Sequence, residues 1–168
     1  MAVQHLDSTT ITLMEATPRT PVDGALQGGG LRVAKGVVTP AADDTANSTY
    51  RFCRIPSNAI VHQVLINAAD ATTAGAVNIG LWDTESNGDA VVDADLFASA
   101  LDLSGGPYNN SDQTFESGEY TLAESETRIW EVLGLSEDSH KEYDVVAQVS
   151  TTFNGGPTAI QLTVYYSV

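Results

Sequence analysis

The chain of 168 residues has one cysteine, only seven lysines and arginines, and no long run of apolar residues. The single thiol, Cys53, excludes a disulfide framework within the chain and a zinc cluster built from thiolates. The apolar stretches are far shorter than the roughly 20 residues that a helix needs to span a bilayer. The first residues lack the basic start and the apolar segment of a signal peptide, so we expect synthesis in a cytoplasm without export by that route.

The scarcity of basic residues excludes two classes of partner. Seven lysines and arginines face 22 acids, which gives a formal net charge of -15. Affinity for nucleic acids comes mostly from basic side chains on phosphates, and anionic membranes attract the same side chains. We therefore expect neither a nucleic acid nor a membrane as partner.

The acidic charge is unevenly distributed along the sequence. Residues 1–54 hold five bases and five acids, whereas residues 55–168 hold two bases and 17 acids. This asymmetry indicates two surfaces with different tasks, of which the neutral one contacts a partner. Two alternatives stay open, because acids also keep a β-rich protein soluble and can be an adaptation to high salt. The basic residues that we expect at the partner interface are Arg19, Arg32, Arg51 and Arg54.

Motifs of the common enzyme classes are missing as well. The sequence has no G-x-S-x-G elbow, no P-loop and no G-x-G-x-x-G fingerprint. The three histidines are far apart and lack the spacing of a metal pair. We therefore predict a protein that is not an enzyme and that needs no cofactor.

What the sequence does contain is short runs with the period of a β-strand. Six runs alternate apolar and other residues between clusters of Gly, Pro, Asn and Asp: 31–38, 48–55, 60–66, 77–81, 143–150 and 160–166. Shorter runs at 101–103 and 113–115 bring the count to about eight. The predicted fold is all-β, a jelly-roll sandwich or barrel of about eight antiparallel strands over residues 31–168.

Two short helices and an N-terminal arm complete this prediction. Thr121 and Glu124 have the spacing of a capping box, and Gly134 is placed to end the helix that follows. Asp93–Ala100 is a second helix candidate, with Asp93 as its cap. Residues 1–30 have no sustained period and are rich in Gly and Pro, which predicts an extended arm.

One loop has the spacing of a metal site. Asp83, Glu85, Asn87 and Asp89 offer oxygen ligands at alternate positions, as in the first half of a calcium loop. The twelfth position is Ala94 where such loops have Glu, and an acidic hairpin turn has a similar composition. We predict a turn and keep these four residues as a weak metal candidate.

Four aromatic residues allow two interpretations. Tyr165 and Tyr166 point to opposite faces of the last predicted strand, so one of them faces away from the core. We predict that Tyr165 belongs to the partner interface, where exposed tyrosine is common. Together with Trp82 and Trp130 these residues could also form a sugar-binding platform.

Several strings of the sequence resemble small virion proteins of tailed bacteriophages. They are RIPSNA at 54–59, GAVNIGLWD at 75–83, DAVVDADLFA at 89–98, YDVVAQVS at 143–150 and AIQLTVYY at 159–166. The sequence is most similar in kind to the jelly-roll cement, or decoration, proteins of phage heads, over roughly residues 31–168.

The resemblance implies a homotrimer on the exterior of the capsid that clamps neighbouring subunits of the major capsid protein. The protein would be made in the cytoplasm of the host and located in the virion. The family brings no catalytic residues with it. Two alternatives stay open: another virion component, such as a head-fibre base or a tail protein, and a carbohydrate-binding jelly-roll module.

Overall fold

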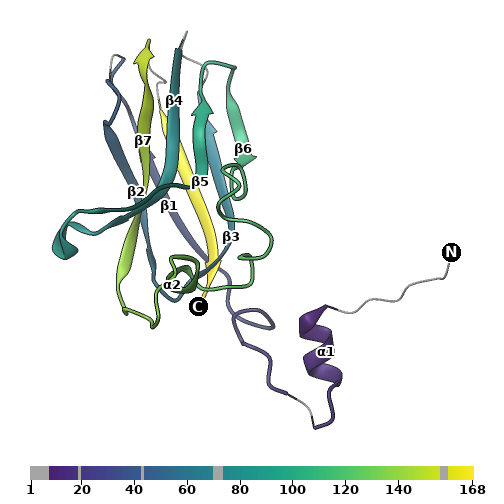
Figure 1. Ribbon diagram of the computed structural model, residues 1–168. Helices are drawn as coiled ribbons and strands as arrows, with labels where there is room; N and C mark the ends of the chain where they lie inside the picture. Colours follow the sequence, from purple (N-terminus) through teal and green to yellow (C-terminus); the bar gives the residue numbers. More distant parts are fainter. Residues whose placement is uncertain (1–7, 19, 43, 70–73, 156–158) are drawn as a thin grey trace, which may run out of the picture.

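The computed structural model describes residues 8–18, 20–42, 44–69, 74–155 and 159–168. The described chain forms two four-stranded sheets that pack face to face, as Figure 1 shows. The eight strands are β1 (Arg32–Val38), β2 (Thr49–Pro56), β3 (Ile60–Ala68), β4 (Ala74–Asp83), β5 (Val91–Asp102), β6 (Tyr108–Asp112), β7 (Glu142–Asn154) and β8 (Ile160–Ser167).

Strand order identifies the sandwich as a jelly roll. One sheet has the order β1-β8-β3-β6 and is called the β1 sheet below; the β2 sheet has the order β2-β7-β4-β5. All pairings within the two sheets are antiparallel. The predicted all-β fold of about eight strands is therefore confirmed.

The core fills the space between the sheets. Val64 and Leu162 from the β1 sheet and Ile79 and Val145 from the β2 sheet are fully buried there. Burying an aliphatic side chain of this kind contributes about 1.5–3 kcal/mol. The core is therefore built by the alternation that predicted six of the strands, and all six runs are strands in the structure.

One predicted helix is wrong, because Asp93–Ala100 lies within strand β5. The neighbours Leu96, Phe97 and Ala98 are all buried, although successive residues of a regular strand alternate between faces. The pairing of β4 with β5 contains three register shifts, which break that alternation. The irregular pattern places apolar residues at a spacing that resembles a helix.

The helix predicted from the capping box at Thr121 and Glu124 begins later in the chain than that box indicated. Helix α2 (Ile129–Val132) starts after Arg128, whose backbone N–H donates to the Glu131 carboxylate at 2.9 Å. Gly134 has a φ of 69° just beyond the helix, which fits its predicted role as terminator. The expected strand at 113–115 is also wrong, since the eighth strand is β6.

The N-terminal segment is not extended throughout. Helix α1 (Thr9–Glu15) begins after Ser8, whose hydroxyl accepts from the N–H of Ile11 at 3.2 Å. Figure 1 shows α1 apart from the sandwich. The chain meets the sandwich at Ala25, whose carbonyl accepts from the Ser167 hydroxyl at 2.9 Å. None of the described helices is long and apolar enough to cross a membrane.

Candidate functional site

The outer face of the β1 sheet carries little charge over β1, β8 and β3, whereas on β6 it carries Asp112, which pairs in register with Leu65. Its side chains alternate with the core residues and form three rows across β1, β8 and β3: Val33, Tyr165 and Gln63; Lys35, Thr163 and Leu65; Val37, Gln161 and Asn67. The only charged group among these nine is Lys35. Val33 and Val37 are more than half exposed, so this face offers apolar and amide groups to a partner.

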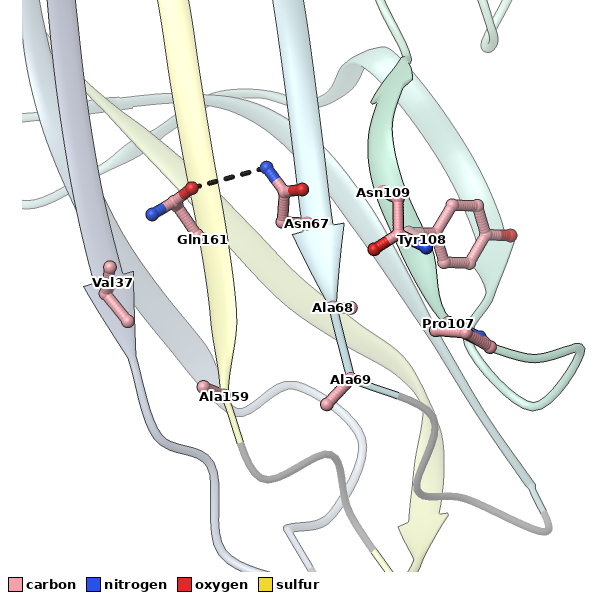
Figure 2. A pocket seen from close by; sticks show the side chains of 9 residues that line it. All are labelled: Val37, Asn67, Ala68, Ala69, Pro107, Tyr108, Asn109, Ala159 and Gln161. Atoms are coloured by element: carbon pink, nitrogen blue, oxygen red, sulfur yellow. Dashed lines mark hydrogen bonds between the residues drawn. The ribbon is translucent and has the colours of Figure 1, made fainter.

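A hollow of about 340 Å³ lies at one end of this face. Figure 2 shows Asn67 and Gln161 pointing toward one another, and the Asn67 amide donates to Gln161 Oε1 at 3.3 Å. Asn67 also exchanges two hydrogen bonds with Asn110, of 2.9 and 2.8 Å. The described residues that line the hollow are uncharged, so it offers apolar and amide groups for contact with a partner.

The outer face of the β2 sheet is charged, but its charges neutralise one another. Arg51 Nη1 lies 2.5 Å from Asp144 Oδ2, and Arg54 Nε lies 2.7 Å from Asp144 Oδ1. Arg51 also pairs with Asp89. Only 8% of the Asp144 side chain is exposed. Burial alone would raise the pKa of Asp144, but the hydrogen bonds and charges of Arg54 and Arg51 hold it below its usual value.

The predicted interface residues therefore fall into different groups. Arg51 and Arg54 are both held by Asp144 of their own chain, which is 93 and 90 residues away in sequence. Arg32 is exposed on β1 and takes part in none of the ion pairs found in the described residues. Tyr165 is on the outer face of the β1 sheet, whereas Tyr166 packs against the core. Arg19 lies outside the described residues.

The sequence around Val33, Lys35 and Val37 predicts a strand but contains no motif that marks these residues as part of a partner surface. One signal in the sequence could have identified this surface. The side chains that alternate with Val33, Lys35 and Val37 include the small residues Ala34 and Gly36, so the larger side chains of this part of β1 are on the outer face.

The Asp83–Asp89 loop is a hairpin tip between β4 and β5 that projects from the sandwich in Figure 1. Its chain forms the short 3₁₀ helix η1 (Glu85–Asn87), and the Asp83 N–H donates to the Ala90 carbonyl at 2.8 Å. Asp89 pairs with Arg51, and Asp83 lies 3.6 Å from Lys141. Two carboxylates of the loop therefore turn toward separate cations, and a metal at these four residues stays a prediction.

A different group of carboxylates comes together beside β5. Asp93, Asp95 and Glu119 place ligand atoms within 4.8 Å of one another. Repulsion by Asp93 and then by Asp95 raises the pKa of Glu119. None of the ion pairs in the described part of the chain includes these three residues.

The lone thiol is not a reactive one. Cys53 is a free cysteine on β2, and burial followed by the charge of Asp144 raises its pKa to about 12. A thiol of that pKa is protonated at neutral pH and a poor nucleophile.

The four aromatic residues considered for a sugar platform are dispersed. Trp82 is only 3% exposed within β4, Trp130 is half-buried on α2, and Tyr166 packs against the core. These side chains, all in the described part of the chain, do not share one exposed surface.

Comparison with known proteins shows a similarity to a solved structure. No family model matches the chain, and no curated protein matches it. A chain in the solved structure of the cyanophage Pam1 capsid asymmetric unit is similar with a TM-score of 0.52 at 16% sequence identity. The match covers 89% of this chain and 93% of that chain. At this identity the similarity shows a shared fold.

Proposed function

We propose that this protein is a structural component of a phage virion that binds the outside of the head. In this role it cements adjacent subunits of the major capsid protein and stabilises the expanded shell, as a homotrimer and without catalysis. The observation that carries the proposal is the jelly roll shared, over nearly its whole length, with a chain of a phage capsid asymmetric unit. The distribution of charge supports the proposal as well. The largely uncharged outer face of the β1 sheet suits contact with a partner, and the acidic rest of the surface suits exposure to solvent.

The physical basis of cementing would be mass action. A protein that binds the assembled shell and not the dissociated subunits stabilises the shell by its binding free energy. At a free concentration of about 100 times Kd this amounts to about 2.7 kcal/mol for each occupied position. Many positions acting together would resist the pressure of packaged DNA.

The test compares purified particles with and without this protein. We expect particles that carry it to release their DNA at a higher temperature, and added purified protein to restore that temperature to depleted particles. Equal release temperatures with the protein bound would contradict cementing.

Copy number separates this proposal from its nearest alternative. A cement protein is present in many copies, in proportion to the major capsid protein, whereas a head-fibre base or tail protein is present in few. Quantitative mass spectrometry of intact particles measures this ratio.

A further inference from the structure

An apolar stripe with one cation lies on β1 and its entry. Leu31, Val33 and Val37 are 62%, 55% and 58% exposed, and Lys35 lies between Val33 and Val37 on the same face of the strand. We call these four residues the β1 stripe; Arg32 pairs in register with Tyr166 and lies on the other face. The larger side chains of this strand face solvent because β1 approaches β2 closely: a Cβ on Gly36 would lie 1.9 Å from the Phe52 carbonyl oxygen. Exposed apolar side chains that gather on one face are typical of a contact with a partner.

A second apolar patch lies in the segment after β6. Phe115, Gly118, Tyr120, Thr121, Leu122 and Ala123 line a hollow of about 450 Å³ and are called the loop patch. Leu122 is 78% exposed and Phe115 is 41% exposed. The Phe115 ring stacks on the fully buried Tyr120 ring with centroids 5.8 Å apart, so the floor of the patch is fixed to the core. Glu119 lies between the lining residues Gly118 and Tyr120 in the sequence, and its carboxylate lies close to those of Asp93 and Asp95.

The charges of the two surfaces complement each other. Some described lysines and arginines have carboxylate partners in their own chain: Arg51, Arg54, Arg128 and Lys141. Lys35 of the β1 stripe takes part in none of these ion pairs, and neither do Asp93, Asp95 and Glu119. Within the described residues, a lysine without an ion-pair partner thus lies in one apolar surface, and carboxylates without one lie near the other.

The fold prevents one copy from joining its own two surfaces. Strands β1 and β6 form opposite edges of the β1 sheet, and the loop patch follows β6. The segment then runs along β5, where the N–H groups of Ser117 and Tyr120 donate to the carbonyls of Phe97 and Leu96 at 3.1 and 3.2 Å. The stripe therefore faces out of the sheet, and the loop patch lies on the side that joins β6 to β5.

We propose that the β1 stripe of one copy docks on the loop patch of a second copy, with Lys35 against Asp93, Asp95 and Glu119. Such a contact joins two different surfaces, so it continues from copy to copy, and it forms a ring when the rotation between neighbouring copies closes. The size of the ring, three copies, rests on the proposed function. A second copy is the occupant that the local charge favours, because the lysine of one surface can pair with the carboxylates near the other. The rest of a chain of net charge -15 repels its own kind, so this pairing also selects which surfaces meet.

Two substitutions test the two surfaces separately: a charge reversal in the β1 stripe and the replacement of an apolar side chain in the loop patch. Sedimentation velocity of the full chain measures self-association in each case. Lys35→Glu and Leu122→Asp should each weaken self-association by roughly tenfold or more, because each removes a central contact of the interface. Thr49→Glu, on an exposed position of β2, and Leu135→Asp, at an apolar side chain 40% exposed elsewhere, are matched controls and should assemble as the natural chain does. Circular dichroism checks that each variant is folded.

Two further combinations test which surfaces meet. Glu119→Lys together with Lys35→Glu should restore assembly, because the exchanged charges again attract. An equal mixture of the Lys35→Glu and Leu122→Asp chains should give pairs of one copy each, since only one intact stripe and one intact patch remain. Assembly of either variant by itself at natural strength would overturn the proposal, and so would failure of the double reversal with both single variants folded.

Particle binding separates this inference from the proposed function. Loss of self-association in Leu122→Asp, which leaves the outer face of the β1 sheet unchanged, with retained binding to heads would support the contact and leave the cementing role in place. A natural chain that binds heads but stays monomeric at all concentrations would overturn the contact alone. A chain that forms rings but never binds heads would overturn the cementing role alone.

Discussion

The two outer faces of the sandwich carry charge in opposite ways. On the β2 sheet, Arg51 and Arg54 converge on Asp144 and form a closed network. On the β1 sheet, Lys35 stands among valine, tyrosine, threonine and amide side chains without a carboxylate partner in the described part of the chain. The difference teaches that a basic residue indicates a partner surface only when it has no ion pair with a carboxylate of its own chain. Of the five predicted interface residues, Arg32 and Tyr165 keep that potential on the β1 sheet.

The largest expected effect breaks the closed network. Asp144→Ala leaves two arginines without their shared carboxylate, and we expect a loss of about 2–3 kcal/mol in the free energy of unfolding, somewhat below the cost at a fully buried pair. Lys35→Ala on the other face is the matched change and should stay within about 0.5 kcal/mol. Urea denaturation measures both. Equal losses would remove the distinction between the two faces.

The next effect concerns the edge where β1 approaches the β2 sheet. Gly36→Ala would place a Cβ 1.9 Å from the Phe52 carbonyl oxygen, so β1 must shift outward. We expect a loss of about 1–3 kcal/mol in the free energy of unfolding, as for other overpacked positions. Gly30→Ala is the control, because a Cβ there meets nothing within 4 Å. If both variants unfold alike, the close approach of β1 and β2 is not what turns the β1 stripe outward.

A smaller effect is expected on how the free energy of unfolding changes as the pH falls. The pKa of Asp144 is lowered in the folded chain, so its contribution to stability is present above its usual value and is lost as the pH falls through the lowered one. Asp144→Asn should be less stable at neutral pH and should lose less on acidification than the natural chain. Urea denaturation at several pH values between about 2.5 and 7 measures this slope. Glu126→Gln controls for the loss of one exposed carboxylate, and an unchanged slope in Asp144→Asn would contradict the network.

Sequence could predict the parts of this fold whose period is regular. In β8, Ile160, Leu162 and Val164 alternate with outward residues, and the strand was predicted within one or two residues. In β5 the register shifts bury Leu96, Phe97 and Ala98 in succession, so local pattern favoured a helix. Bulges depend on the neighbouring strand, which a local pattern does not contain.

The candidate surfaces were harder to predict because they depend on pairing between distant residues. Nothing near Arg51 or Arg54 in the sequence reveals that Asp144 lies opposite them on β7. The predicted capping pair Thr121 and Glu124 does form a hydrogen bond of 2.9 Å, but it closes a turn and not a helix. The hydrogen bond between these two residues was thus predicted correctly, but the element that contains it was not.

The smallest expected effect sharpens the comparison at the β1 stripe itself. Val33 and Val37 are more than half exposed, so Val33→Thr and Val37→Thr should change the free energy of unfolding by about 0.5 kcal/mol or less when measured on dilute, dissociated chains. Val64→Thr makes the same change at a fully buried position on the inner face of this sheet and should cost about 1–3 kcal/mol, because a hydroxyl enters the core. A large loss at Val33 or Val37 in dilute chains would mean that the monomer already covers the stripe. A small loss there, together with weaker self-association at higher concentration, means that these valines contribute to assembly and not to folding, so their exposure is a property of the separated copy.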